Sequence, residues 1–429
     1  MSATTLLVAL GALVLGGVLA MLFDVTRGTP LSRVVTDDGR QPPSVDEPAF
    51  LEAVEGYLGA SLTPGHRLAL HCNGDEIFPR LWRDVAAARR FVLVQIYYCQ
   101  EGAVADALRD ALVERARAGV EVRLLLDGFG SSLGDAYLAS LRDAGVRVAV
   151  LRPLRLAHIR RLMHRAHLRA VVIDGEVGWA GGFGIADKWL GDGCREGSWR
   201  DSAARFEGPA VRQLLGAFGV CWAEATGELI ASASWWTPRD PATRDGARAA
   251  VLFAAPTVGS TASERFHALT ISGARRSLYL TNSYFVPDDD FRRLLCDAAK
   301  RGVDVRVLTP RSGSTDVPMT YLAGRARYEE LLESGVRIFE YAPSMIHAKT
   351  IVTDGAWCTV GSMNADNRSA ALNEEVNLLV HDAAFGAELE RVFHDDLGRA
   401  AEIDLEQFRH RGIVQRGLEW GAHLLARIL

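Results

Sequence analysis

The stretch AARRFVLVQIYY, residues 87–98, has the pattern of a helix end followed by a buried strand, and GARRSLYLTNSYF, residues 273–285, repeats it. Two further pairs follow in the same order: ARAGVEVRLLLDG (116–128) with AKRGVDVRVLTPR (299–311), and LRDAGVRVAVL (141–151) with LLESGVRIFEY (331–341). The members of each pair lie about 180 to 190 residues apart, which is too long for a solenoid repeat. One glycine turn between a helix and a strand is ordinary in α/β proteins, but three ordered pairs predict a duplicated domain.

Each half of the chain alternates amphipathic helices with short strands rich in β-branched residues. This alternation is typical of a sheet covered by helices. We therefore predict an α/β fold of two pseudo-symmetric lobes, each a mixed β-sheet flanked by helices, over residues 49–235 and 246–405. At 429 residues the chain is long enough for two domains with separate cores. The join is expected near residues 230–250, where Pro, Ser, Gly and charged residues collect.

The amino terminus begins with 23 residues that carry no charged side chain, and residues 6–23 form an unbroken apolar run. Such a run is just long enough to cross a bilayer as a helix. A cleaved signal peptide is the rival interpretation, but the basic start and the cleavage site of such peptides are missing. We predict a transmembrane anchor over residues 1–26 and a polar linker over residues 27–48. Because Arg27 and Arg33 follow the span, the positive-inside rule predicts a single-pass protein of the cell membrane with cytoplasmic lobes.

The carboxyl-terminal residues 406–429 form an amphipathic tail, in which apolar residues near helical spacing stand among arginines. A helix of this kind suits the surface of an anionic membrane. Packing of the same helix against the second lobe is an equally good interpretation of the pattern.

The repeat also carries a polar motif that no fold requires, AHLRAVVIDG at residues 166–175 and IHAKTIVTDG at residues 346–355. Each copy has the form His-x-Lys/Arg-x4-Asp and precedes a turn of small residues, AGGFG at 180–184 and VGSMN at 360–364. The candidate site residues are His167, Arg169, Asp174, Gly182 and Gly184 in the first copy, and His347, Lys349, Asp354, Ser362 and Asn364 in the second. A single match to so short a motif is weak, whereas two at matching repeat positions are strong.

These residue types at this spacing suit chemistry on a phosphate group. In an extended strand, residues i and i+2 point to the same face, so each histidine shares a face with the cation two positions later. A histidine can attack phosphorus or donate a proton to a leaving oxygen, and the cation can hold the phosphate oxygens. Small turn residues let the backbone approach the phosphate, and the amide of Asn364 can donate to it. Asp174 and Asp354 are less specific, because an Asp-Gly pair after a strand is also ordinary turn chemistry.

The motif pair resembles that of the phospholipase D superfamily, and the surrounding sequence is similar to bacterial cardiolipin synthases. The phrases that carry this resemblance are DGFGS (127–131), WRDSAARFEGPAV (199–211), SYFVPDDD (283–290), GSMNADNRS (361–369) and LNEEVNLLV (372–380), together with the apolar N-terminal run. The resemblance extends from about residue 65 to residue 411, so it is more specific than a motif coincidence.

The resemblance implies one active site at the interface of the two lobes, where one histidine forms a phosphohistidine and the other acts as general acid and base. It implies no metal and no other cofactor. Glu375 and Asp201 would orient the two imidazoles, and family practice favours His167 as the nucleophile, although the residues themselves do not decide this. The residues expected to contact the substrate phosphate are Arg169, Lys349, Ser362, Asn364 and Gly182.

The first copy of the motif departs from the family pattern at two positions. Arg169 stands where the family usually has lysine, and Gly184 stands where it usually has asparagine. Arginine keeps the charge but is bulkier, and glycine removes an amide donor outright. The sequence therefore predicts a weakened first half-site.

The functional prediction is a phosphatidyltransferase of the cardiolipin synthase type, with phospholipids, and phosphatidylglycerol in particular, as its substrates. A hydrolytic phospholipase D, a phosphodiesterase or nuclease, and a non-catalytic lipid-binding relative are the alternatives. A net charge of −5 and a pI of about 6.2 argue against nucleic acid as the partner, as does a membrane anchor. Six scattered cysteines form no metal-finger or disulfide pattern. The oligomeric state does not follow from the sequence.

Overall fold

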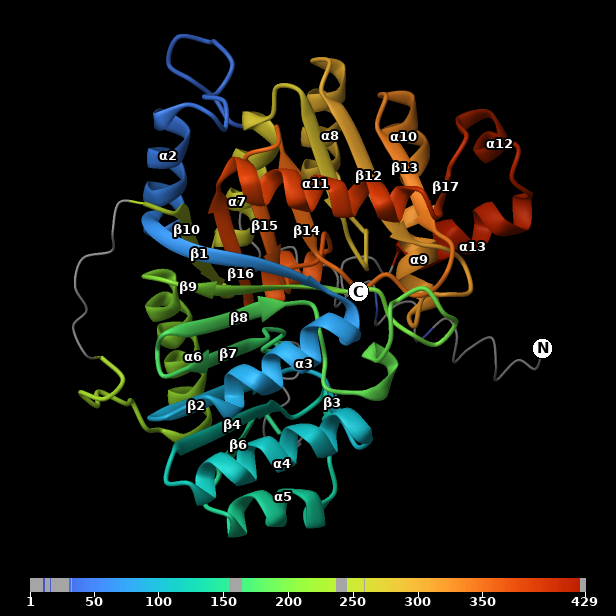
Figure 1. The fold of residues 1–429 in the computed structure, drawn as a ribbon. Helices are drawn as coiled ribbons and strands as arrows, with labels where there is room; N and C mark the ends of the chain where they lie inside the picture. The colour runs from blue at the N-terminus through green and yellow to red at the C-terminus, as the bar shows by residue number, and fades with distance from the viewer. Residues whose placement is uncertain are drawn as a thin grey trace.

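The computed structural model describes residues 11, 16, 31, 33–153, 164–236, 245–257 and 259–424. Fifteen strands of this part of the chain form one continuous mixed sheet that runs through both lobes (Figure 1). The first-lobe strands are β1 (Thr63–Cys72), β2 (Phe91–Ile96), β4 (Glu121–Asp127), β6 (Arg147–Leu151), β7 (Ala170–Ile173), β8 (Val177–Gly181) and β9 (Ser202–Glu207). The second-lobe strands are β10 (Ala247–Ala254), β11 (Ser277–Thr281), β12 (Asp304–Pro310), β13 (Arg337–Tyr341), β14 (Thr350–Thr353), β15 (Trp357–Gly361), β16 (Glu375–His381) and β17 (Ala400–Glu402). A small separate sheet pairs β3 (Cys99–Gln100) with β5 (Ser131–Ser132).

The two lobes meet where β1 pairs with β10 in antiparallel orientation. Outward from this junction, the first lobe continues in the order β9, β8, β7, β2, β4, β6, and the second in the order β16, β15, β14, β11, β12, β13. Equivalent strands pair in equivalent ways, because β4 is parallel to both β2 and β6, just as β12 is parallel to both β11 and β13. The structure thus confirms the predicted duplication, with β17 added at the outer edge of the second lobe.

Helices cover both faces of the sheet, and the described residues form three large hydrophobic cores and one small cluster. The first-lobe helices are α3 (Asn73–Ala86), α4 (Ala103–Arg117), α5 (Asp135–Asp143) and α6 (Ala210–Thr226). The second-lobe helices are α7 (Ala262–Gly273), α8 (Asp289–Lys300), α9 (Pro318–Arg325), α10 (Tyr328–Glu333) and α11 (Ala383–Leu397). One core extends through both lobes and includes α6 and α11. A second contains α3, α4 and α5, and a third contains α7, α8 and α10, so each lobe also has a core of its own.

The helix α2 (Pro48–Leu58) packs with the second lobe, although the sequence pattern placed it in the first. Its Phe50 and Val54 belong to the same core as α7. Phe50 meets Trp357 edge to face, with 5.2 Å between the ring centroids. The chain therefore leaves the second lobe and enters the first along β1, which joins the lobes in the middle of the sheet.

The two ends of the chain are described to different extents. The predicted anchor over residues 1–26 lies almost wholly outside the described residues, as does part of the predicted join between the lobes. Within the described residues, no helix combines the length and the apolar character needed to span a bilayer. The tail forms α12 (Leu405–Arg409) and α13 (Ile413–His423), and α13 packs against α9 of the second lobe. Of the two interpretations of the tail, the structure shows the packing.

Each histidine motif leads into a β-hairpin. In the first lobe β7 turns into β8 through Asp174 and Gly175, and in the second lobe β14 turns into β15 through Asp354 and Gly355. All four turn residues have φ between 52° and 73°, which is the left-handed geometry of Asp-Gly hairpin turns. The hairpins fix the strands that begin just after the two histidines.

Candidate active site

A cavity of about 580 Å³ lies between the two lobes and is lined by both motif histidines. His167 and His347 are buried, and each lies shortly before the first strand of its hairpin. Arg169 and Asn364 line the same cavity, one from each lobe. The structure therefore brings the two half-sites together into a single site.

Backbone contacts hold the segment before each histidine against the opposite lobe. Glu374 N donates to Arg165 O at 2.8 Å, and His347 N donates to Arg200 O at 2.6 Å. In each case the next residue along the partner segment is an acid. The contacts thereby place an acid of one lobe beside the histidine of the other, a crossed arrangement that the sequence did not indicate.

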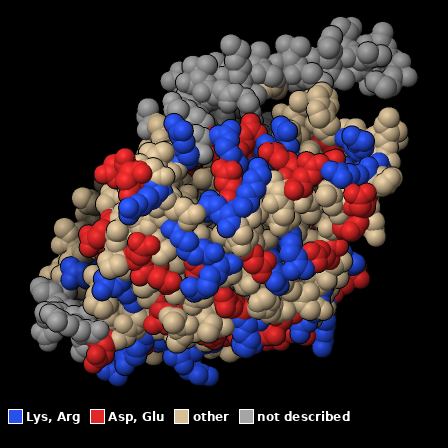
Figure 2. Space-filling model, turned by 90° about the horizontal axis from the view of Figure 1, so that it is seen from above, with Lys and Arg blue, Asp and Glu red and all other residues tan. Residues whose placement is uncertain are grey.

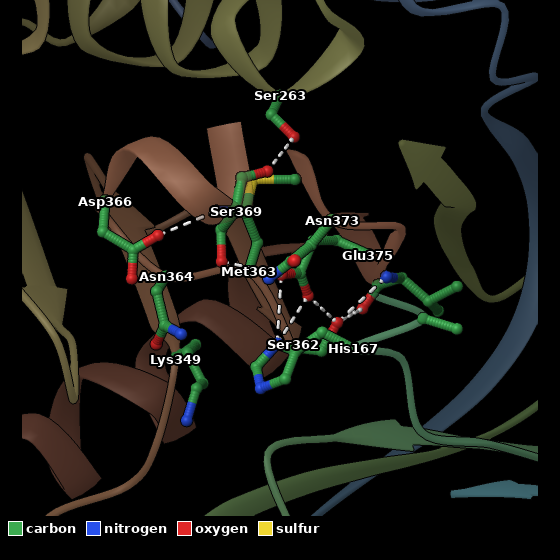
Figure 3. Close-up of polar contacts among 12 residues, drawn as sticks. His167, Ser263, Lys349, Ser362, Met363, Asn364, Asp366, Ser369, Asn373 and Glu375 are labelled. Atoms are coloured by element: carbon green, nitrogen blue, oxygen red, sulfur yellow. Dashed lines mark hydrogen bonds and ion pairs between the residues drawn. The ribbon is translucent and has the colours of Figure 1, made fainter. Parts of the chain in front are cut away.

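His167 is paired with Glu375 of the second lobe (Figure 3). Its Nδ1 lies 3.0 and 3.1 Å from the two carboxylate oxygens. The buried carboxylate also accepts bonds from the hydroxyls of Ser362 at 2.5 Å and Ser369 at 2.7 Å. A carboxylate held in this way fixes the tautomer and orientation of the imidazole, which leaves Nε2 for the substrate. Ser362 therefore holds the acid, and its expected contact with phosphate stays a prediction.

His347 is paired with Asp201 of the first lobe in the same manner. Its Nδ1 lies 2.9 Å from Asp201 Oδ2, and the indole Nε1 of Trp189 donates to that oxygen at 2.8 Å. The other carboxylate oxygen accepts a bond from Ser202 N at 2.8 Å. The two acids are thus equivalent in position but supported by different neighbours, hydroxyls for Glu375 and an indole for Asp201.

The two motif cations lie close to the histidines that precede them. Lys349 Nζ is 2.9 Å from His347 Nε2, and Arg169 Nη1 donates to His167 O at 2.6 Å. Burial, together with the charges of Arg169 and Lys349, lowers the pKa of both histidines well below its ordinary value. Without a bound phosphate, this shift favours the neutral form of each ring, which carries a lone pair on one nitrogen. Burial also lowers the pKa of Lys349 to about 7.

Asp174 and Asp354 lie away from the histidines, at the turn end of the two hairpins. Their carboxylates each accept three backbone N–H bonds of 2.7 to 2.9 Å, from residues 89–91 and 275–277 respectively. These bonds connect each hairpin turn to the start of the neighbouring strand, β2 or β11. The structure does not bring the two aspartates into the cavity, and their contacts support the turn interpretation of the motif.

Gly182 makes room for the acid of its own lobe. A Cβ at this position would lie 2.4 Å from Asp201 Oδ1 and 2.8 Å from His347 O, so any other residue would push the pair apart. Asn364 was also expected to contact the phosphate. It lines the cavity and accepts a bond from the Ser283 hydroxyl at 3.3 Å. Contact of either residue with phosphate stays a prediction.

Trp189 explains the departure at Gly184. A Cβ at 184 would lie 2.7 Å from Cη2 and Cζ3 of this indole and 3.1 Å from Tyr98 O. The indole belongs to a short 3-10 turn, Asp187–Trp189, and also meets the His347 ring edge to face at 5.3 Å. It fills the space that an asparagine at 184 would need, so the first half-site is rebuilt around Trp189.

A Gly184→Asn variant, which restores the residue usual in the family, is therefore expected to harm the protein. The new side chain displaces Trp189 from Asp201, which should lower the free energy of unfolding by about 1 to 3 kcal/mol and reduce turnover at least about tenfold. Denaturant titration and a transfer assay measure the two effects. Gly219→Asn is the matched control, because a Cβ at 219 on α6 meets no neighbouring atom within 4 Å. A rise in activity of Gly184→Asn would contradict this account of Trp189.

Sequence reasoning missed Trp189 and Ser369, the side chains that support the two acids. A tryptophan in a glycine-rich loop is ordinarily read as a packing residue, and nothing in its spacing connects it to Asp201. Ser369 lies in a π-helical turn, Arg368–Leu372, whose position beside Glu375 depends on the fold. Its N–H donates at 2.7 Å to Asp366, whose pKa burial raises to about 7.

A family model described as the cardiolipin synthase, PLD-like domain, matches residues 81–197 and 269–397, more than half of the chain. The chain belongs to the cardiolipin synthase family. A cardiolipin synthase of Geobacillus kaustophilus is 34% identical over 363 residues, which are 84% of this chain and 72% of that protein. One of Halalkalibacterium halodurans is 33% identical over 359 residues, or 83% of this chain and 71% of that protein. Membership of the phospholipase D superfamily, expected from the motifs, is thereby confirmed.

Two solved structures share the fold of this cardiolipin synthase family member. The phosphatidylserine synthase of Haemophilus influenzae Rd KW20 superposes with a TM-score of 0.66 at 13% identity, over 89% of this chain and 100% of that one. The polyphosphate kinase of Porphyromonas gingivalis gives a TM-score of 0.53 at 13% identity, over 92% of this chain and 56% of that one. At this identity the likeness concerns the fold alone.

Proposed function

We propose that this protein transfers a phosphatidyl group from one phosphatidylglycerol to a hydroxyl of a second, releasing glycerol. The observation that carries the proposal is the crossed site, in which two histidines face one cavity and each contacts an acid of the other lobe. A phosphate between them can be attacked by one ring while the other handles the proton of the alcohol. Kinship with cardiolipin synthases supports phospholipids as the substrate class.

In the proposed first step, His167 Nε2 attacks the phosphorus of the donor lipid and the bond from phosphorus to the glycerol oxygen breaks. His347 enters this step as the imidazolium, which the negative charge of the bound phosphate favours, and its Nε2–H gives the proton to that oxygen. Glycerol then leaves, a phosphohistidine remains, and His347 is left neutral. In the second step His347 takes the proton from a hydroxyl of the acceptor phosphatidylglycerol, which attacks phosphorus and releases His167. Arg169 and Lys349 hold the phosphate oxygens throughout. The 2.9 Å contact of Lys349 Nζ with His347 Nε2 supports His347 as the ring that exchanges protons.

The choice between an alcohol and water as acceptor depends on how dry the cavity is. Its wall is rich in aromatic rings: Tyr97, Tyr98, Phe129, Trp189, Trp199 and Tyr284. Such a wall favours the apolar part of a lipid over bulk water, which supports transfer to a second lipid over hydrolysis.

The rate should fall on the alkaline side of neutrality because of Lys349. Its pKa of about 7 means that the protonated fraction falls as pH rises through 7, and with it the charge that holds the phosphate. We expect kcat/KM to fall by about tenfold per pH unit on this limb. A Lys349→Arg variant keeps its charge, so its limb should move to higher pH whatever its overall rate. The measurement is the pH dependence of kcat/KM in both proteins. If the alkaline fall occurs at the same pH in Lys349→Arg, a group other than Lys349 causes it.

The proposed reaction is tested by supplying the purified full chain with phosphatidylglycerol in mixed micelles. We expect cardiolipin and glycerol in equal amounts. Phosphatidic acid without cardiolipin would make the protein a hydrolytic phospholipase D. Lipid binding without any product would make it a non-catalytic relative.

Nucleic acid is a poorer candidate substrate. On the face shown in Figure 2, lysine and arginine side chains are interspersed with aspartate and glutamate. A phosphodiester backbone favours a continuous basic groove, and the described residues of this face do not provide one. We place the enzyme at the cell membrane, with its lobes on the cytoplasmic side as the charges after residues 6–23 indicate.

A further inference from the structure

Helix α13 carries its large apolar side chains outward, whereas Glu419 faces the protein. The exposed fractions are 86% for Ile413, 74% for Val414, 59% for Leu418 and 65% for Trp420. Glu419, on the opposite side of the helix, is only 1% exposed. A surface helix of a protein surrounded by water has the reverse arrangement, with the apolar stripe on the core. The orientation of α13 therefore calls for an apolar environment outside the protein.

Ion pairs and a hydrogen bond fix α13 in this orientation. Glu419 accepts bonds from Arg325 Nε at 3.1 Å and from Arg411 Nε at 2.7 Å. One turn further on, Arg327 Nε donates to His423 Nε2 at 3.0 Å. Rotating the helix to bury its apolar side would leave the buried Glu419 and Arg325 without each other. The packing of α13 on α9 therefore keeps the large apolar side chains of α13 exposed.

The same packing connects α13 to the entrance of the active site. It rests on α9 (Figure 1). Thr320 of α9 and the preceding Val317 line the cavity. Met319 of α9 is also exposed. On the first lobe, Phe129 lines the cavity and is 63% exposed. Exposed apolar side chains therefore lie at or near the cavity on both lobes.

We infer that the outward side chains Ile413, Val414, Leu418 and Trp420 of α13, with Leu424 just after it, dock on a phospholipid bilayer and hold the cavity entrance at the lipid surface. This inference rests on the proposed function, because a phospholipid substrate must pass from a bilayer into the cavity. Aliphatic residues combined with a tryptophan suit the boundary between head groups and acyl chains. Arg416, also exposed on this helix, suits the anionic head group of phosphatidylglycerol. Docking through α13 would set how the lobes face the membrane.

The inference is tested by measuring the depth of α13 in a membrane. Cys72 and Cys194 are replaced by serine, because the other four cysteines are buried, and Leu418→Cys is labelled with an environment-sensitive fluorophore in the full chain. The protein is reconstituted into vesicles of phosphatidylglycerol and phosphatidylcholine with brominated acyl chains. We expect at least about twofold quenching of the label at 418. The control is Leu229→Cys, at a position that is 79% exposed and does not line the cavity, where no quenching is expected.

A kinetic measurement complements the depth measurement. Ile413→Glu combined with Leu418→Glu should reduce turnover of phosphatidylglycerol in vesicles at least about tenfold, since carboxylates leave the acyl region. Turnover of a monomeric short-chain phosphatidylglycerol should stay within about twofold of wild type, because the active site is untouched. Leu229→Glu should change neither rate.

The outcomes separate this inference from the proposed reaction. Absence of quenching at 418, or equal rates of the double variant and wild type on vesicles, would overturn docking. A change in the label at 418 with protein concentration in lipid-free detergent would mean that a second copy covers the helix, which also overturns it. If the double variant loses both activities, its fold is damaged and the quenching result alone decides. Quenching at 418 in a protein that makes no cardiolipin would uphold docking and reject the reaction.

Discussion

Loss of the covalent intermediate is the expected result of His167→Ala, together with a fall in cardiolipin formation of at least about 10⁴-fold. His347→Ala should lower turnover by a similar factor, because this ring both protonates the leaving glycerol and activates the acceptor hydroxyl. Since the nucleophile is intact, the adduct should still form slowly, and it should persist because its removal is slowed as well. Incubation with ³²P-labelled phosphatidylglycerol, followed by rapid denaturation, measures the label bound to each variant. The adduct should therefore accumulate in His347→Ala and be absent from His167→Ala.

The control for this pair is His410→Ala, at an exposed histidine of the tail whose Nδ1 contacts Glu406 O. It should retain wild-type turnover within about twofold. Label on His167→Ala and none on His347→Ala would reverse the assignment of the two rings while keeping the reaction. Absence of label from all variants, with cardiolipin still formed by wild type, would exclude the phosphohistidine route.

The second large effect is expected on replacing Asp201 or Glu375, because the two substitutions should block different steps of the reaction. Asp201→Asn and Glu375→Gln keep the shape of the side chain but no longer hold the imidazole Nδ1–H, so each should reduce turnover by about 10² to 10⁴-fold. Because Asp201 bonds to His347, Asp201→Asn should behave as His347→Ala does and accumulate labelled adduct. Glu375→Gln should behave as His167→Ala does, with little adduct formed.

The crossed arrangement is what this comparison tests. If each acid served the histidine of its own lobe, the adduct would accumulate in Glu375→Gln instead of Asp201→Asn. Trp189→Phe provides an intermediate case, since it removes the Nε1–H that supports Asp201 and keeps an aromatic ring in the space beside Gly184. We expect a smaller loss than in Asp201→Asn, of about tenfold, with the same accumulation of adduct.

The duplicated sheet could be predicted from the sequence because it depends on local patterns. A helix end, a glycine turn and an apolar strand keep their spacing in both halves, and the matching strands β2 and β11 occupy equivalent places in the sheet. The placement of α2 could not be predicted, because Phe50 is apolar enough for either core and only the fold presents Trp357 to it.

The residue types of the candidate site could be predicted from the sequence, but the contacts between them could not. His167 and His347 line one cavity, but the pairing of each with an acid of the opposite lobe depends on backbone contacts between distant segments. In the sequence Gly184 indicates the loss of an amide donor, whereas in the structure it makes room for the Trp189 indole. Asp174 and Asp354 could not be assigned from the sequence, because an Asp-Gly turn and a catalytic aspartate would have the same residue at the same spacing.

The crossed pairing has a genetic consequence. Since each lobe contributes the histidine of one pair and the acid of the other, damage in either half of the gene disables both pairs at once. Two chains that carry lesions in different halves cannot rescue one another by simple mixing, because an intact lobe on one chain still has the damaged lobe of that chain as its partner. Rescue requires that lobes be exchanged between chains, and the β1–β10 seam of the common sheet opposes such an exchange.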